Sequence, residues 1–354
     1  MRIALDAMGG DRAPEAVVEG AVLALAQVPA DVEVVLVGDL ERIKPILDHL
    51  GPPSDRLHLQ HASEVVAMDE APGVALRRLK DSSIRVCYNL HKAGEADAVV
   101  SAGNTGAVMA LGVVIMGRLA EVDRPALASA FPALRGPTLL IDVGANVDCT
   151  PMMLLQFGYM GSVYAERVMG LERPQVGLLN VGEEPGKGNT AVKQASEYLK
   201  NSALNFRGNV EGRDLFVGET QVIVCDGFVG NICLKLVEGL AINFNVFFRE
   251  IMTGTIKGRL GGLLLKNNFR DVATRMDYAT YGGAPLLGIN GVSLICHGSS
   301  SPKAIVSAVK AAANTVRAEV TRHLSEGLEH YHDSLAAGKV RELRPHTVPG
   351  GPGQ

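Results

Sequence analysis

The segment Ala96–Val114, ADAVVSAGNTGAVMALGVV, carries the pattern on which the predicted fold depends. It predicts a short buried strand over Ala98–Ser101, a tight polar turn, and an apolar helix from about Ala107. Unpaired N–H groups at the helix start and the positive end of the helix dipole form a site for an anion. The same pattern also fits an ordinary strand–helix junction in which Thr105 simply caps the helix. The choice between an anion site and an ordinary junction depends on whether the chain repeats the pattern.

Strands and helices alternate along most of the chain, which predicts a mainly parallel sheet with helices on both faces. The predicted strands are Arg2–Asp6, Val32–Val37, Leu57–Gln60, Ala98–Ser101, Ala126–Phe131, Thr138–Asp142, Val176–Asn180, Gln221–Cys225, Tyr281–Gly288 and Val292–Cys296. The predicted helices include Pro14–Gln27, Leu40–Leu50, Leu76–Lys80, Ile84–Ala93, Thr150–Met169, one ending at Lys200, and one from Pro302 to about Gly327. No change in composition divides the chain. We therefore expect one domain over residues 1–338 with a central cleft, and a flexible tail over 339–354.

Composition excludes several classes of protein. The 354 residues carry a net charge of −4, so the basic excess of a general nucleic-acid binder is missing. Five scattered cysteines, none in a C-x-x-C pair, fit a reduced cytoplasmic protein without disulfides or a zinc site. The chain opens directly into a strand, so we expect no signal peptide, and no apolar run is long enough to predict a membrane span.

Small clusters of glycine and short polar residues follow several predicted strands. In open α/β sheets ligands bind at the carboxyl ends of the strands, so we expect the clusters to gather along one crevice. Aspartates and asparagines at strand ends also serve simply as helix caps or turn residues, and that alternative stays open for each. The candidate substrate-binding residues are Asp6, Gly9, Gly10, Ser101, Gly103, Asn104, Thr105, Gly106, Asp142, Asn146, Asn189, Asp226, Gly230 and Ser299.

Three familiar motifs do not match. The first strand–helix turn holds only Gly9-Gly10, so the dinucleotide fingerprint G-x-G-x-x-G is missing there. The turn Gly182–Thr190 lacks both the spacing and the hydroxyl of a nucleotide-binding P-loop, and no G-x-S-x-G nucleophile elbow occurs. No cluster has metal-ligand spacing, so we predict neither a metal nor another cofactor. These mismatches favour a small anion over a nucleotide as the ligand.

Three residues are candidates for catalysis. Lys187 stands between two glycines that permit close approach, so it suits a phosphate, and an exposed loop lysine is the alternative. Asn231 follows the Asp226 turn and offers an amide donor. His297 precedes Ser299 and is a candidate acid or hydrogen-bond donor, whereas a lone histidine at a strand end is often structural.

Six motifs occur in a fixed order, and together they resemble the PlsX-type bacterial phosphate acyltransferase family. The resemblance covers about Met1 to Gly327. The motifs are DAMGGD (Asp6–Asp11), SAGNTGA (Ser101–Ala107), DVGAN (Asp142–Asn146), LLNVGEE with KGN (Leu178–Glu184, Lys187–Asn189), DGFVGN (Asp226–Asn231) and YGGAPLLG (Tyr281–Gly288).

The resemblance implies transfer of a fatty acyl group from acyl carrier protein to inorganic phosphate, giving acyl phosphate for phospholipid synthesis. It also implies a homodimer and a three-layer α/β/α fold similar to the isocitrate/isopropylmalate dehydrogenases and phosphotransacetylases. A membrane acyltransferase that uses acyl phosphate is a further expected partner. Phosphate is itself the nucleophile, so the protein has to position it and stabilise an oxyanion. We expect Lys187 and the Ser101–Gly106 turn to bind phosphate, and Asn231 with the His297–Ser299 corner to serve the oxyanion or the thioester. The alternatives are a dehydrogenase that uses NAD(P) and a phosphotransacetylase that uses acyl-CoA.

A helical hairpin is predicted over residues 231–277. Its first helix, Asn231–Met252, has an apolar stripe suited to dimerisation. A loop over Thr253–Lys266 holds Leu263, Leu264 and Leu265 among cations, and Asn267–Asp277 is predicted to return as a second helix. Seven basic and four acidic residues give the hairpin a local net charge of +3. The leucines suit an anionic membrane surface, and burial in a dimer interface or contact of the cations with acyl carrier protein are the alternatives. Membrane contact through the leucines predicts a cytoplasmic protein that is peripherally associated with the membrane.

Overall fold

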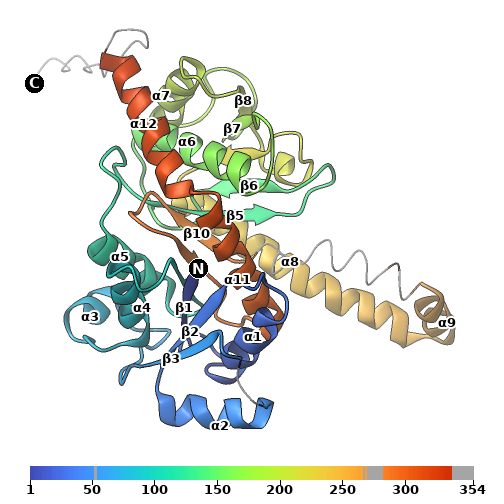
Figure 1. Cartoon of the computed structure of the whole chain (residues 1–354). Helices are drawn as coiled ribbons and strands as arrows, with labels where there is room; N and C mark the ends of the chain where they lie inside the picture. Colours follow the sequence, from blue (N-terminus) through green and yellow to red (C-terminus); the bar gives the residue numbers. More distant parts are fainter. Residues whose placement is uncertain (52–53, 266–267, 269–281, 337–354) are drawn as a thin grey trace, which may run out of the picture.

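The computed structural model describes the chain except residues 52–53, 266–267, 269–281 and 337–354. Figure 1 shows two halves, each with helices against strands, and a long helix that leaves the body. One half contains the first strands and the other contains the green and yellow segments from the middle of the chain. The predicted tail over 339–354 lies outside the described residues.

Within the described residues, eleven strands form one sheet in the order β3-β2-β1-β4-β11-β10-β5-β6-β9-β7-β8. The strands are β1 (Arg2–Asp6), β2 (Glu33–Gly38), β3 (Leu57–His61), β4 (Ala98–Ser101), β5 (Ala126–Phe131), β6 (Thr138–Ile141), β7 (Val176–Leu179), β8 (Phe206–Val210), β9 (Val222–Val224), β10 (Ala284–Leu287) and β11 (Ser293–Ile295). Most neighbouring pairs are parallel, so the expected mainly parallel α/β sheet is confirmed.

The sheet reverses direction in its middle. β10 pairs antiparallel with both β11 and β5, and β5 pairs antiparallel with β6. The strands β1 to β4 and β11 therefore run opposite to β6 to β9. The expectation that all the polar clusters gather along one crevice is wrong, because the two parallel blocks point their carboxyl ends in opposite directions. Only the turns near the middle, where the sheet twists from strand to strand, meet around a shared cleft.

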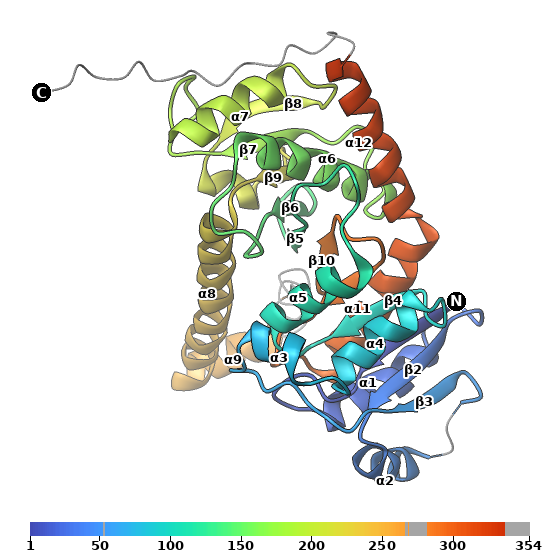
Figure 2. The ribbon, with the colours of Figure 1, turned by 90° about the vertical axis from the view of Figure 1, so that its left-hand side faces the viewer.

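Helices cover both faces of the sheet. They are α1 (Glu15–Leu25), α2 (Leu40–Leu50), α3 (Pro72–Arg77), α4 (Ser83–Lys92), α5 (Thr105–Met116), α6 (Pro151–Arg167), α7 (Thr190–Lys200), the 3-10 helix η1 (Gly212–Phe216), α8 (Gly227–Gly254), α9 (Ile256–Leu264), α11 (Pro302–Arg317) and α12 (Val320–Ala336). Figure 2 shows α12 descending beside α6 to meet α11.

The core follows the alternation of side chains along the strands. In β1, Ile3 and Leu5 pack with α1 and α11, while Ala4 packs on the opposite face with α4. In β6, Leu139 and Ile141 pack with α6 and α12 on one face. The core that contains Ala4 continues into the second half of the sheet. The two halves thus share one band of buried side chains.

Four elements differ from the sequence-based prediction. The helix predicted over Leu76–Lys80 lies instead at α3, Pro72–Arg77, because Pro72 begins it. The predicted loop Thr253–Lys266 contains the helix α9, since the Thr255 side chain accepts from Gly258 N at 2.9 Å and caps it. The predicted helix from Pro302 to Gly327 is two helices, and Glu319 between them has a φ of +47°. The edge strand β8, Phe206–Val210, was not predicted because FRGNV has no apolar run. The predicted helix Asn267–Asp277 lies, apart from Asn268, outside the described residues.

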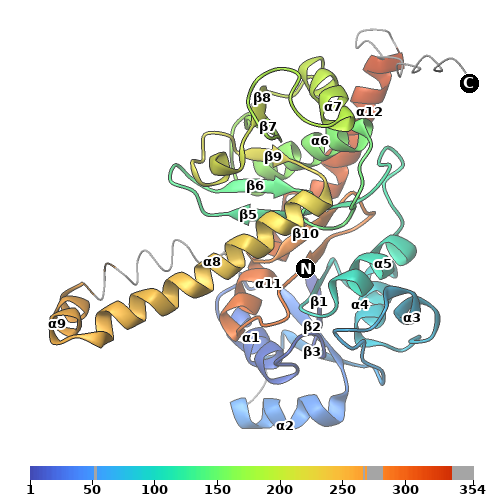
Figure 3. The same ribbon diagram turned by 180° about the vertical axis from the view of Figure 1, so that it is seen from behind.

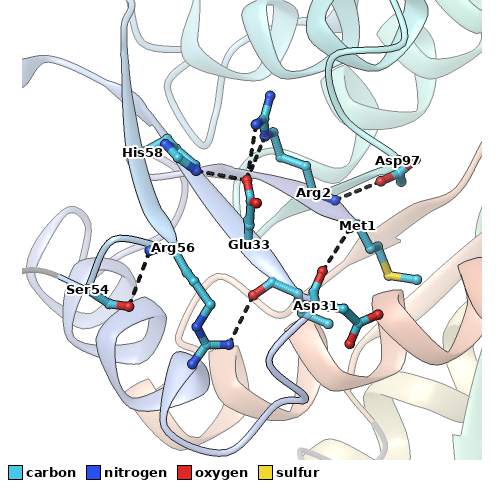
Figure 4. Close-up of polar contacts among 9 residues, drawn as sticks. Met1, Arg2, Asp31, Glu33, Ser54, Arg56, His58 and Asp97 are labelled. Carbon is cyan, nitrogen blue, oxygen red and sulfur yellow. Dashed lines mark hydrogen bonds and ion pairs between the residues drawn. The ribbon is translucent and has the colours of Figure 1, made fainter.

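A polar network ties the start of the chain to the edge of the sheet (Figure 4). The guanidinium of Arg2 and the Nε2 atom of His58 both contact one oxygen of Glu33, at 3.0 and 2.8 Å. The hydrogen bond from Arg2, followed by that from His58, lowers the pKa of Glu33. Arg2 N also donates to Asp97 at 2.7 Å. The network fixes β1 against β2 and β3 at the surface, on the opposite side from the candidate site.

The helix α8 leaves the body and ends at α9 (Figure 3). It is the one helix of the described chain long and apolar enough to cross a membrane, and none of that apolar stretch is buried. Its large apolar side chains are exposed, among them Leu236 at 61%, Phe247 at 58% and Ile251 at 69%. Its first turns nevertheless line a cleft in the protein body, so we interpret α8 as a projecting arm.

Candidate functional site

A cavity of about 480 Å³ lies in the middle of the molecule, where the sheet reverses direction. The turn after β4, the turn after β6, the first turns of α8 and the corner after β11 surround it. Its polar lining residues are Arg12, Thr105, Ser129, Asn231, Lys235, Glu238, His297, Ser299, Ser300 and Ser301. Its apolar lining includes Leu127, Ala130, Val143, Leu234, Ala284 and Ile295. The cavity therefore combines charged donors with an apolar wall.

Four of the predicted site residues lie together in this cavity: Thr105, Asn231, His297 and Ser299. They come from three separate parts of the chain, and Gly144 of the DVGAN motif lies beside them. The other predicted residues are not among its lining residues, and most of them support the turns that line it. The supporting contacts are hydrogen bonds in the turns after β1, β4 and β6.

Asp6 and Ser101 connect the turns after β1 and β4. The buried Ser101 hydroxyl donates to Asp6 Oδ2 at 2.6 Å and accepts from Gly103 N at 3.0 Å. A Cβ at Gly9 would lie 2.6 Å from both Asp6 Oδ2 and Gly103 N, so glycine is needed for this close approach. Gly10 also packs against the cleft corner, since a Cβ there would lie 2.9 Å from Gly298 O. Asp6 therefore holds turns in place within the core.

Burial raises the pKa of Asp6 above its ordinary value of 3.8, although hydrogen bonds to the carboxylate act in the opposite direction. Because the pKa of Asp6 is higher in the folded state than in the unfolded chain, the folded state binds the proton more tightly. The stability that protonated Asp6 contributes is therefore lost as pH rises from about 4 through the raised pKa. The amide in the variant Asp6→Asn does not titrate. We expect this variant to gain stability relative to the wild type between about pH 4.5 and about pH 7.5, measured by urea unfolding. A stability difference that is the same at both pH values would contradict this.

The Asn104 side chain is fully engaged within the protein. Its Oδ1 accepts from Ala107 N at 2.9 Å, so Asn104 rather than Thr105 caps α5. Its Nδ2 donates to Ala67 O, Met68 O and Glu70 O at 2.8–3.2 Å. The helix consequently begins at Thr105, two residues before the predicted start. Thr105 is left to face the cleft at the positive end of α5.

Asp142 organises the turn after β6. Its buried carboxylate accepts five hydrogen bonds of 2.7–3.1 Å, four from backbone N–H groups and one from the Asn146 amide. Asn146 Nδ2 also donates to Pro125 O at 2.8 Å. Burial raises the pKa of Asp142, although these hydrogen bonds favour its charged form. The pair thus fixes the turn that presents Gly144 to the cleft.

The first turn of α8 packs directly onto the turn after β6. Asp226 caps the helix by accepting from Val229 N at 2.8 Å. A Cβ at Gly230 would lie only 1.8 Å from Asp142 O, so no other residue fits this contact without displacement. Asn231 follows, with its side chain 3.6 Å from the Cβ position of Gly144. Within the described residues its amide has no hydrogen-bond partner, and it remains available to a ligand.

The sequence did not indicate three charged residues of the cleft: Arg12, Lys235 and Glu238. Arg12 directly follows the DAMGGD motif. Lys235 and Glu238 lie four and seven residues after Asn231. Helical periodicity therefore places Asn231, Lys235 and Glu238 on one face of α8. That periodicity was the signal that could have identified Lys235 and Glu238.

Lys187 lies on a loop between β7 and α7, away from the lining of the cavity. Its side chain is exposed. Asn180 Nδ2 donates to Lys187 O at 3.1 Å, and Gly188 with a φ of +91° makes the tight approach to Asn180 possible. Asn189 caps α7 by accepting from Val192 N at 2.9 Å. The loop is therefore ordered by its own contacts and by glycine.

The cleft contains no activated thiol among its described lining residues. Cys296 lines it, and burial raises the pKa of this thiol to about 12, so it stays protonated at neutral pH. Within the described part of the chain, no group of three or more His, Cys, Asp or Glu side chains is placed to hold a metal ion. The groups that are present can bind an anion and donate hydrogen bonds.

Comparison with known proteins places these features in a family. A family model described as "Fatty acid synthesis protein" matches residues 1–323. The phosphate acyltransferase of Geobacter sulfurreducens is 50% identical over 329 residues, which cover 93% of this chain and 94% of that protein. The phosphate acyltransferase of Heliobacterium modesticaldum is 50% identical over 318 residues, which cover 90% and 94%.

Solved structures share the fold at low sequence identity. A phosphotransacetylase from Streptococcus pyogenes aligns with a TM-score of 0.61 at 17% identity, covering 89% of this chain and 94% of that one. A 4-hydroxythreonine-4-phosphate dehydrogenase from Klebsiella pneumoniae aligns with a TM-score of 0.52 at 14% identity, covering 89% and 99%. These likenesses confirm the predicted fold class and, at this identity, nothing more.

Proposed function

We propose, from the premise that this chain belongs to the fatty acid synthesis protein family and is a phosphate acyltransferase, that it moves a fatty acyl group from acyl carrier protein to inorganic phosphate. The observation that carries the proposal is the match along nearly the whole chain to curated phosphate acyltransferases. The cleft adds support, because it sets cationic and hydrogen-bonding groups beside an apolar wall.

In the proposed reaction a phosphate oxygen attacks the thioester carbonyl carbon. The C–S bond breaks, and a phosphate proton goes to the departing sulfur, so acyl phosphate and a free thiol result. Arg12, Lys235 and the start of α5 at Thr105 supply positive potential for the phosphate. The Asn231 amide and His297 donate to the carbonyl oxygen as negative charge develops on it. The reaction needs no nucleophile from the protein, which agrees with the protonated state of Cys296.

The assay that tests this function measures thiol release from acyl carrier protein with and without phosphate. We expect release that depends on phosphate and is faster with acyl-acyl carrier protein than with acyl-CoA. Faster turnover of acyl-CoA would identify a phosphotransacetylase instead. Binding of a nicotinamide nucleotide at micromolar concentration, with no acyl transfer, would favour the dehydrogenase alternative.

Lys187 is a predicted phosphate ligand that does not line the cleft. We propose that the exposed side chain of Lys187 reaches bound phosphate from this ordered loop, since a Lys–phosphate contact is a charge-assisted hydrogen bond. Lys187→Ala should then raise the KM for phosphate by roughly tenfold. Lys193→Ala, which alters an exposed lysine on α7, is the matched control and should leave this KM unchanged. Equal KM values for phosphate in the two variants would remove Lys187 from the site.

The exposed stripe of α8 supports the proposal of a homodimer. The apolar side chains of Leu236, Leu240, Phe244 and Phe248 recur at helical spacing and are 45–61% exposed. Contiguous exposed apolar surfaces of this kind mark interaction sites in soluble proteins. A second copy of the chain is the occupant we propose. Sedimentation of the purified protein at the mass of two chains is the expected result.

The tip of this arm supports a proposal of peripheral membrane contact for a cytoplasmic protein. Leu263 and Leu264 are 71% and 75% exposed and Leu265 is 48% exposed, with Lys257 and Arg259 nearby in the chain. Replacing all three leucines with Asp should abolish co-sedimentation with anionic liposomes while leaving acyl transfer in solution unchanged. Leu134→Asp, at a site 91% exposed, is the control. Undiminished sedimentation of the triple variant would refute the proposal. Contact with a membrane acyltransferase that uses acyl phosphate is proposed at the same arm.

A further inference from the structure

One carboxylate on the cleft wall contacts two of the cleft's nitrogen donors. Glu238 Oε2 lies 2.9 Å from Lys235 Nζ and 3.7 Å from His297 Nε2. The Glu238 side chain is only 13% exposed, whereas that of Lys235 is 58% exposed and that of His297 is 37% exposed. The carboxylate thus stands behind the two donors as seen from solvent. All three residues line the cavity.

The contacts of His297 define which ring nitrogen carries the proton in the neutral ring. The backbone N–H of Ser299 donates to His297 Nδ1 at 3.1 Å, and the Ser299 hydroxyl lies 2.8 Å from the same nitrogen. A nitrogen that accepts a backbone N–H has no proton of its own. The ring proton is therefore on Nε2, on the side that faces Glu238.

We infer that Glu238 is a positioning residue of this site, which fixes the direction of Lys235 and the orientation of the His297 ring. The tautomer of that ring is set by the Ser299 N–H. The inference rests on the proposed function. Through Glu238, the Nζ atom of Lys235 and the Nε2–H of His297 are held near one oxygen atom. At 3.7 Å the Nε2–H makes no hydrogen bond to Glu238, so it stays available to the carbonyl oxygen. Phosphate and the thioester carbonyl then meet donors that are already oriented, which is the condition for electrostatic stabilisation of a transition state.

The position of Glu238 distinguishes it from an ordinary surface ion pair. Exposed pairs at i,i+3 spacing contribute little, because both side chains stay solvated and mobile. Glu238 is mostly buried and contacts a second element, the corner after β11, as well as its own helix. It thereby connects the arm α8 to the corner that carries His297. Without the carboxylate, each of the two donors can turn away independently.

The first test observes His297 directly and requires no turnover. In two-bond ¹H–¹⁵N spectra of histidine-labelled protein, the signals of His297 are those that disappear in the His297→Gln variant. We expect the pattern of the Nε2–H tautomer in the wild type. In Glu238→Ala we expect the same tautomer with a changed Nε2 chemical shift, because the carboxylate beside Nε2 is gone. An Nδ1–H pattern in the wild type, or unchanged signals in Glu238→Ala, would overturn the inference.

The second test separates positioning from a general structural role. Glu238→Ala should lower kcat for acyl transfer roughly tenfold or more, with the KM for acyl carrier protein unchanged. Glu238→Gln keeps an oxygen acceptor at the same place and should restore most of the lost kcat. Glu250→Ala, which alters an exposed residue further along α8, is the matched control and should retain the wild-type kcat. Full kcat in Glu238→Ala would overturn the inference, whereas absence of acyl transfer in the wild type would refute the proposed function and leave the spectroscopic test decisive.

Discussion

Replacing Gly230 with alanine should destabilise the protein by about 3 kcal/mol, measured as the free energy of unfolding in urea, and should abolish acyl transfer. The added Cβ would lie 1.8 Å from Asp142 O and 3.0 Å from Cys225 Sγ. The backbone of Asp142 has little freedom to move, because five hydrogen bonds to its carboxylate hold the turn. The helix must therefore shift away from the turn, taking Asn231 with it.

The control lies in the same helix. A Cβ at Gly239 meets no atom within 4 Å, so Gly239→Ala should stabilise α8 by up to about 1 kcal/mol through helix propensity alone. The two substitutions are chemically identical and differ only in what surrounds them. Equal stabilities for the two variants would show that the contact between α8 and the Asp142 turn is not as close as described.

Asn231→Ala should lower kcat by roughly 100-fold to 1,000-fold, the usual effect of removing one donor to an oxyanion. The KM for phosphate should change little, since we assign phosphate to Thr105 and to the cations Arg12, Lys187 and Lys235. The side chain lies at the cleft wall beside Gly144, and truncation leaves no buried partner unpaired among the described residues. Thermal stability should therefore stay near that of the wild type.

Asn243→Ala provides the comparison for that experiment. Asn243 lies on the exposed part of α8, where its amide donates to Gly239 O at 2.8 Å, and it is remote from the cleft lining. It should retain full activity. A kcat for Asn231→Ala within a few-fold of that for Asn243→Ala would rule out Asn231 as the oxyanion donor.

Much of the fold could be predicted from the sequence because the signals are local. Ala98–Ser101 and Leu40–Leu50 were predicted with their observed bounds, since an apolar run or a capped amphipathic pattern defines each. The reversal at β10 and β5 could not be predicted. Two of its antiparallel pairs, β10–β11 and β5–β6, join neighbouring strands of the chain, but the pairing of β10 with β5 links segments more than a hundred residues apart. A short buried strand has the same composition in either direction, so its sequence does not show that long-range pairing.

The candidate site was predicted in part. Thr105, Asn231 and His297 come together in the cleft as hydrogen-bonding groups. Asp6, Asn104 and Asp142 instead support the turns, and a sequence does not show which carboxylate is saturated by backbone N–H groups. Arg12 and Lys235 have no motif of their own, because a single cation acquires its role only from the wall on which the fold places it.

The central claim is that phosphate held in the cleft attacks the acyl carrier protein thioester directly. It is tested by mixing enzyme with an equal amount of acyl-acyl carrier protein, first without phosphate and then with it, and by quantifying free thiol and acyl phosphate. We predict no thiol release until phosphate is added, and then one acyl phosphate for each thiol. A release of thiol equal to the enzyme concentration before phosphate is added, or thiol release with no acyl phosphate, would contradict the account.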